Sequence, residues 1–83
     1  MKFLQTSRGC AITFEDGEEF AGKELFCEGE KYSNGYLLDF NASCWVKDGK
    51  GIPVTQEEKE NAVPLIIEGA KKQGFVIELI GVK

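Results

Sequence analysis

Histidine is absent from this 83-residue chain, which removes the usual centre of many catalytic and metal sites. Without it there is no Ser–His or Cys–His nucleophile pair, and the commonest metal ligand is missing. The phosphate-binding pattern G-x-x-x-x-G-K-[ST], the dinucleotide pattern G-x-G-x-x-G and the redox pattern C-x-x-C are also absent. We therefore expect no cofactor, no bound metal and no enzymatic activity.

Cysteine is scarce, with residues only at positions 10, 27 and 44. An odd number does not suit a disulfide framework. The sequences around Cys10, Cys27 and Cys44 do not resemble one another, so their equal spacing indicates no repeat. We expect three small apolar side chains inside the strands of a reduced protein.

Long apolar runs are missing as well. No segment approaches the ~20 apolar residues of a membrane span. The first ten residues lack the apolar region of a secretory signal. We expect a cytoplasmic protein that does not contact the membrane.

The composition is that of a small globular protein. Hydrophobic residues make up 42% of the chain and charged residues 29%, with a net charge of −4. A chain of this length forms one domain, residues 1–83, with a modest core.

The strongest structural pattern is a helix at about residues 55–74. Thr55 and Glu58 form a capping-box sequence, and Gly74 is the expected terminating residue. Val63, Ile66, Ile67 and Ala70 make one apolar stripe, which Ala62 and Leu65 widen. Pro64 interrupts this pattern, because an internal proline deletes a hydrogen bond and clashes with the preceding turn. We expect a helix that is bent or broken at Pro64, with a single kinked helix favoured.

The remaining segments have the alternation and turn signals of strands. We expect strands at about 2–7, 10–15, 18–28, 36–46 and 75–82, with a tight turn at Asp16-Gly17 and a bulge or bend at Gly22. Loops are expected at 29–35 and 47–53, and the alternative for the second is a short hairpin at Asp48-Gly49. Within 36–46, Leu38, Phe40, Ala42 and Cys44 should share one face, with Trp45 on the other. The last strand is apolar on both faces, which predicts a central position. The predicted fold is α+β: a mostly antiparallel sheet of four to six strands on one helix.

A run of carboxylates is the first candidate binding site. Residues 15–30 contain a single base, Lys23, and the acidic residues Glu15, Asp16, Glu18, Glu19, Glu24, Glu28 and Glu30. One interpretation is a docking surface for a basic protein. The other is a solvated hairpin whose charge protects a sheet edge. Either way, this charge argues against binding nucleic acid.

Trp45 is the second candidate, because a tryptophan at a strand end can anchor a protein interface. The alternative interpretation, packing in the core, is commoner.

Taken in order, these features resemble a known family. They are Arg8-Gly9, ITFEDG, Gly29-Glu30, the YLLDF strand, Ser43-x-Trp45, the loop to Pro53 and the helix start TQEEK. This pattern resembles small immunity proteins of bacterial polymorphic-toxin and contact-dependent growth inhibition systems. The resemblance implies an inhibitor that binds a cognate toxin domain and occludes its active site. Many such toxins attack nucleic acids through basic clefts, so an acidic surface would suit that partner.

Two other hypotheses remain. One is a structural or assembly module that forms a homodimer through an open sheet edge. The other is a small enzyme that uses carboxylates such as Asp39, or Cys27.

Overall fold

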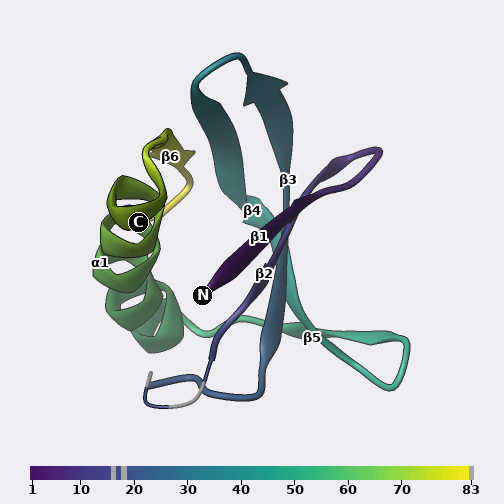
Figure 1. The fold of residues 1–83 in the computed structure, drawn as a ribbon. Helices are drawn as coiled ribbons and strands as arrows, with labels where there is room; N and C mark the ends of the chain where they lie inside the picture. Colours follow the sequence, from purple (N-terminus) through teal and green to yellow (C-terminus); the bar gives the residue numbers. More distant parts are fainter. Residues whose placement is uncertain (16, 18, 83) are drawn as a thin grey trace.

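The fold combines six strands and one helix (Figure 1). The computed structural model describes residues 1–15, 17 and 19–82. In chain order the elements are β1 (Lys2–Gln5), β2 (Gly9–Thr13), β3 (Glu24–Tyr32), β4 (Gly35–Lys47), β5 (Lys50–Pro53), α1 (Gln56–Gln73) and β6 (Val76–Ile80).

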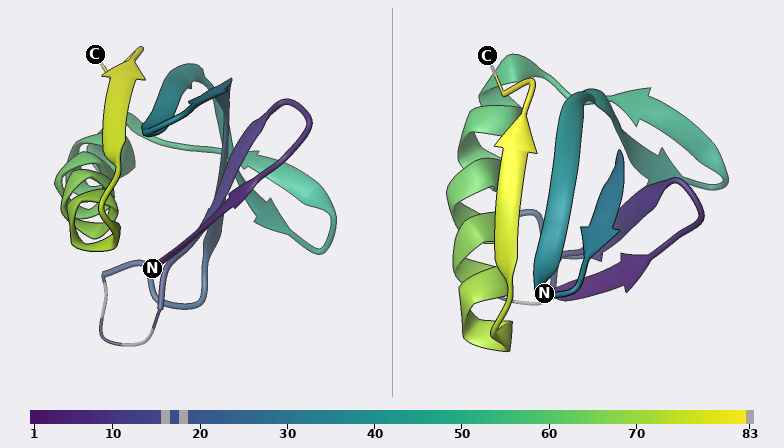
Figure 2. Two further views of the ribbon diagram at one scale, coloured as in Figure 1. Left: turned by 45° about the horizontal axis from the view of Figure 1, so that its top comes forward. Right: turned by 90° about the horizontal axis from the view of Figure 1, so that it is seen from above.

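All six strands belong to one sheet. Strands β1 to β5 follow one another in sequence order, and each is antiparallel to the next. Strand β6 pairs with the first part of β4 and runs parallel to it, which α1 makes possible as the crossover. Figure 2 shows β6 beside both the helix and β4. The predicted α+β fold, a mostly antiparallel sheet on one helix, is confirmed.

The helix follows its sequence signals at both ends. Both hydrogen bonds of the Thr55–Glu58 capping box form, and Gly74 ends the helix in the left-handed conformation at φ 85°. The helix is continuous through Pro64, so it is not broken there. Pro64 lies on the exposed side, where water can bind the carbonyl group that the proline leaves unpaired. Ala62, Ile66 and Ala70 are buried on the opposite side.

A large bulge divides β4 and changes which side chains point inward. Cys27 is paired with Ser43, whereas the next residue, Glu28, is paired with Asp39. Residues 40–42 of β4 are therefore additional to the ladder, and the alternation of faces shifts across them. Leu38 and Phe40 are buried as expected, but beyond the bulge Trp45 is buried and Cys44 is not. The prediction that Cys44 faces the core and Trp45 the opposite side is thus wrong. Gly22, expected in a bulge or a bend, lies in a turn at φ 82°.

Several strand boundaries also differ from those expected. Residues 19–22 form turns, and β3 begins only at Glu24 but continues through the predicted loop to Tyr32. Residues 50–53 pair with β4 as β5 instead of forming a loop. The turn before β5 has Asp48 at φ 52° and Gly49 at φ 77°, as type I′ hairpins require. The predicted turn at Asp16-Gly17 includes Asp16, which lies outside the described residues.

Strand β6 is shorter than the predicted 75–82 and is not central. Within the described residues it pairs only with β4, while Val76 and Ile80 are about half exposed. The apolar residues on both faces of β6 suggested a central strand, but within β6 only Ile77 and Leu79 pack against the core.

The core lies between the sheet and α1. Phe14, Phe20 and Trp45 form an aromatic group, with ring centroids 5.1–6.1 Å apart. Cys10 and Cys27 are buried and free, and burial raises the pKa of the Cys10 thiol to about 11 and that of Cys27 to about 12. These thiols act as small apolar side chains, as expected. The described part of the chain has no helix that is long and apolar enough to span a membrane.

Candidate functional site

The side of β3, β4 and β6 that points away from the helix carries an unusual set of side chains. Tyr36 and Leu38 of β4 are buried beneath it, so the alternating residues Leu37 and Asp39 point outward. Residues paired across a sheet share a face, which places their partners on β3 and β6 on the same side. We call this surface the acidic face and define it by eight residues: Glu28, Glu30, Tyr32, Leu37, Asp39, Val76, Glu78 and Ile80.

The register arranges the acidic face in rows that cross the three strands. Asp39 lies between Glu28 and Ile80 in one row. Leu37 lies between Glu30 and Glu78 in the next. Tyr32, Val76 and Ile80 are 46%, 55% and 50% exposed. The face thus combines carboxylates with exposed apolar side chains, the two features that anchor protein interfaces with basic partners.

A shallow groove of about 390 Å³ runs across one end of the acidic face. It is lined by carboxylate residues, one base and apolar side chains: Glu28, Glu30, Asp39, Arg8, Leu37, Ala42 and Ile80. The Arg8 guanidinium lies 5.7 Å from the centre of the Phe26 ring. Among the ion pairs formed by the described residues, none involves Glu28, Glu30, Asp39 or Glu78. Their charge is available to a partner.

Tyr32 reports the negative potential of this surface. Its hydroxyl donates to Glu30 Oε2 at 3.2 Å. This hydrogen bond, followed by the charges of Glu30 and Glu78, raises the pKa of the Tyr32 phenol. Ionisation of this phenol is disfavoured because it would place a further negative charge beside two carboxylates.

The backbone around the bulge holds the acidic face in place. Asp39 Oδ1 accepts a hydrogen bond from the Asn41 backbone N–H at 2.8 Å, which ties this carboxylate to the start of the bulge. Gly29 permits the close approach of β3 to β4, since a Cβ at this position would lie 1.9 Å from the Leu37 carbonyl oxygen.

The predicted acidic residues fall in two groups. Glu24, Glu28 and Glu30 are all in β3. Glu28 and Glu30 lie on the acidic face, whereas Glu24 lies beyond the bulge and is paired with Val46. Glu15 and Glu19 lie between β2 and β3, where Glu15 pairs with the amino group of Met1. That hydrogen bond and charge lower the pKa of Glu15. Asp16 and Glu18 are outside the described residues.

Sequence reasoning left Asp39 and Glu78 out of the acidic surface. Glu78 is the one polar residue of β6, whereas Asp39 is one of several in β4. Only the pairing of β4 with β3 and β6 brings them to Glu28 and Glu30. The available signal was the interruption of an apolar strand by Glu78.

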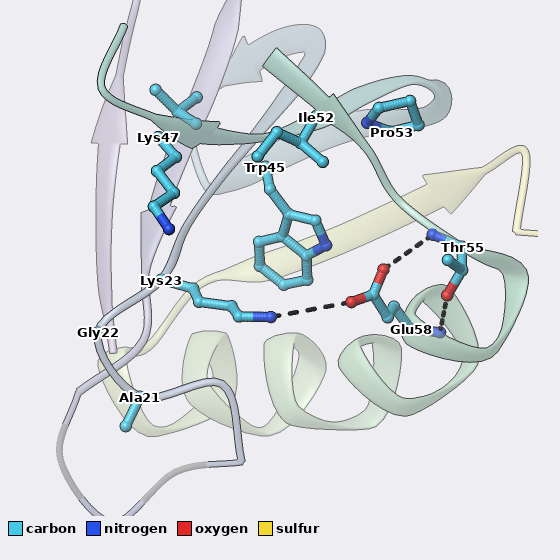
Figure 3. Close-up of a pocket in the computed structure, with 10 residues that line it drawn as sticks. Ala21, Gly22, Lys23, Trp45, Lys47, Ile52, Pro53, Thr55 and Glu58 are labelled. Carbon is cyan, nitrogen blue, oxygen red and sulfur yellow. Dashed lines mark hydrogen bonds and ion pairs between the residues drawn. The ribbon is translucent and has the colours of Figure 1, made fainter. Parts of the chain in front are cut away.

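Trp45 lines a cleft of about 580 Å³ between β4, β5 and the start of α1 (Figure 3). The side chain is only 6% exposed, and its ring packs against Phe14 and Phe20. This is the core position that the commoner interpretation predicts. Lys23, which also lines the cleft, has its Nζ 5.0 Å from the centre of the Trp45 ring.

Glu58 connects the elements around this cleft. Its Oε1 accepts the Thr55 backbone N–H at 2.9 Å, and its Oε2 lies 3.9 Å from Lys23 Nζ. The pKa of Glu58 is lowered, mostly by the hydrogen bond from the Thr55 N–H. The Trp45 indole N–H has the next largest effect, and the charge of Lys23 has a weaker one. The indole nitrogen makes no hydrogen bond of ordinary geometry within the described residues, but Figure 3 shows it turned toward the Glu58 side of the cleft. We interpret this cluster as a brace between the sheet and the helix.

Among the residues that the structure describes, no three His, Cys, Asp or Glu side chains are grouped so as to hold a metal ion. Comparisons of this chain with protein-family models, with curated proteins and with solved structures find no match.

Proposed function

We propose that this protein is an immunity protein that binds and neutralises a cognate bacterial toxin domain through the acidic face. The observation that carries the proposal is the grouping of Glu28, Glu30, Asp39 and Glu78 around exposed apolar side chains, without ion pairs among the described residues. In this role the protein acts by occlusion in the cytoplasm and catalyses no reaction. The resemblance in the order of its sequence motifs supports the same role.

The chemistry of the acidic face suits a basic partner such as a nuclease domain. A nuclease presents Lys and Arg to substrate phosphates, and carboxylates on a rigid sheet can compete for those cations. The net charge of −4 adds long-range attraction, which speeds association at low ionic strength. The exposed side chains Tyr32, Val76 and Ile80 supply apolar contact once the complex forms.

Protection of cells tests this function directly. A candidate toxin domain, sought in the reading frames next to this gene, is expressed with the wild-type protein, with the double variant Glu28→Lys/Glu30→Lys, or with the control Glu60→Lys/Glu68→Lys. The control makes the same charge change on exposed positions of α1. We expect wild type and control to restore growth and the acidic-face variant to fail while remaining folded. Equal protection by both double variants would show that the acidic face is not the interface.

The alternative is a homodimeric assembly module, which the unpaired edge of β6 favours. Sedimentation over a range of concentrations separates the two functions. A monomer at every concentration excludes the homodimer, whereas a stable dimer that buries β6 would support it.

A further inference from the structure

The free edge of β6 presents backbone groups that are ready to pair. The Val76 N–H donates to the Asn34 carbonyl at 2.9 Å, which directs the backbone groups of Val76 toward β4. Because backbone direction alternates along a strand, the N–H and C=O groups of Ile77 and Leu79 point away from β4. Within the described residues no strand pairs with them. β5, another edge strand, contains Lys50 and Pro53, which discourage pairing, whereas β6 contains neither residue type.

Apolar side chains border this edge on both faces of the sheet. On the outer side lie Val76 and Ile80, with Glu78 between them. On the inner side, the helix contributes Ile67, which is 42% exposed. Leu65 and Gly69 are on the flank of α1 that meets Met1, and helical geometry places Ile67 on the opposite flank. Figure 2 shows that β6 is the strand that runs beside the helix.

We propose that the β6 edge receives an extended segment of the partner, which adds a strand to the sheet beside the acidic face. This inference rests on the proposed function, because it specifies how the toxin domain is held. The segment carries Lys or Arg opposite Glu78, with apolar residues two positions before and after it. Its alternate side chains cover Ile67 on the inner side. Backbone pairing then supplies affinity, and the central cation supplies specificity.

A second copy of this chain fits the edge less well. The antiparallel register that pairs all five residues of β6 places Glu78 directly opposite Glu78 of the other copy. Like charges directly opposite each other destabilise a strand pair. The edge is therefore complementary to a segment with a cation at this position.

Two synthetic peptides test the inference without the toxin. One is Thr-Val-Thr-Lys-Thr-Val-Thr, and the other has Glu in place of Lys. At millimolar concentration we expect the Lys peptide to slow amide exchange of Ile77 and Leu79 roughly twofold or more. The Glu peptide should bind about fivefold more weakly. The variant Glu78→Lys should reverse this preference, and the control Glu68→Lys should leave it unchanged.

Three results would overturn the inference. They are no slowing with either peptide, equal slowing with both, or slow exchange at Ile77 and Leu79 without peptide in a protein that sediments as a dimer. The last result would identify a second copy as the occupant. Amide exchange with the peptides is measured independently of cell protection. The strand-addition inference and the proposed function can therefore fail separately.

Discussion

Glu28 and Asp39 lie directly opposite each other across β3 and β4, so two formal negative charges face outward from one strand pair. Such a placement opposes folding, because like charges at directly opposed positions repel. Natural proteins accept local conflicts of this kind at functional sites. Under the proposed function, this repulsion is tolerated because both carboxylates contact the basic partner.

Replacing one member of this pair should stabilise the protein. We expect Glu28→Gln to raise the free energy of unfolding by about 0.5 kcal/mol, since it removes the repulsion and keeps the side-chain shape. Urea denaturation at neutral pH measures the change. Glu68→Gln on α1 is the control and should change stability less. A loss of stability in Glu28→Gln would mean that the glutamate contributes to the fold.

Tyr32 should ionise at a higher pH than an ordinary tyrosine. The hydrogen bond to Glu30 and the charges of Glu30 and Glu78 raise its pKa, and Glu30→Gln should bring it back toward the usual value. NMR of tyrosine labelled at Cζ follows this titration. Tyr36 is the internal control, since its pKa is raised first by burial and then by Cys10, and it should not respond to Glu30→Gln. A Tyr32 titration that is the same in wild type and variant would contradict the arrangement of charges.

Glu58 should make stability depend on pH in the acidic range. Its folded-state pKa is lowered, so the ionised form stabilises the fold above the unfolded value of about 4.3, and this contribution is lost as pH falls through the folded value. Glu58→Gln retains an acceptor for the Thr55 N–H but not the charge. We expect the variant to be less stable by roughly 0.5 kcal/mol at pH 7 and to match wild type at low pH.

Measuring thermal stability of both proteins across pH 2–7 isolates this effect, because Glu15, whose pKa is also lowered, contributes equally to both. A constant difference at every pH would assign the loss to the altered cap instead of to the charge.

Local signals explain what the sequence could predict. The capping box, the terminal glycine and the apolar stripe all act within a few residues, and they located α1 almost to the residue. The bulge opposite Cys27 and Glu28 has no comparable signal, because it depends on how β4 meets β3, β5 and β6 together. It moved Trp45 inward and made the predicted faces of β4 wrong beyond Phe40.

The candidate site was predicted only in part for the same reason. Glu28 and Glu30 are close in sequence and were recognised, whereas Asp39 and Glu78 join them through pairing between distant segments. The parallel pairing of β6 with β4 brings Glu78 to the acidic face. The sequence of β6 did not indicate this edge position, because apolar residues on both faces are typical of a central strand.

The association rate of the toxin domain with this protein is the most direct test of the account. Stopped-flow measurements at low and at physiological salt compare wild type, Glu28→Lys/Glu30→Lys and the control Glu60→Lys/Glu68→Lys. We expect the acidic-face variant to associate at least about tenfold more slowly at low salt and to lose most of the salt dependence, while the control stays near wild type. Equal rates and equal salt dependence for the two double variants would contradict the claim that the acidic face receives the partner.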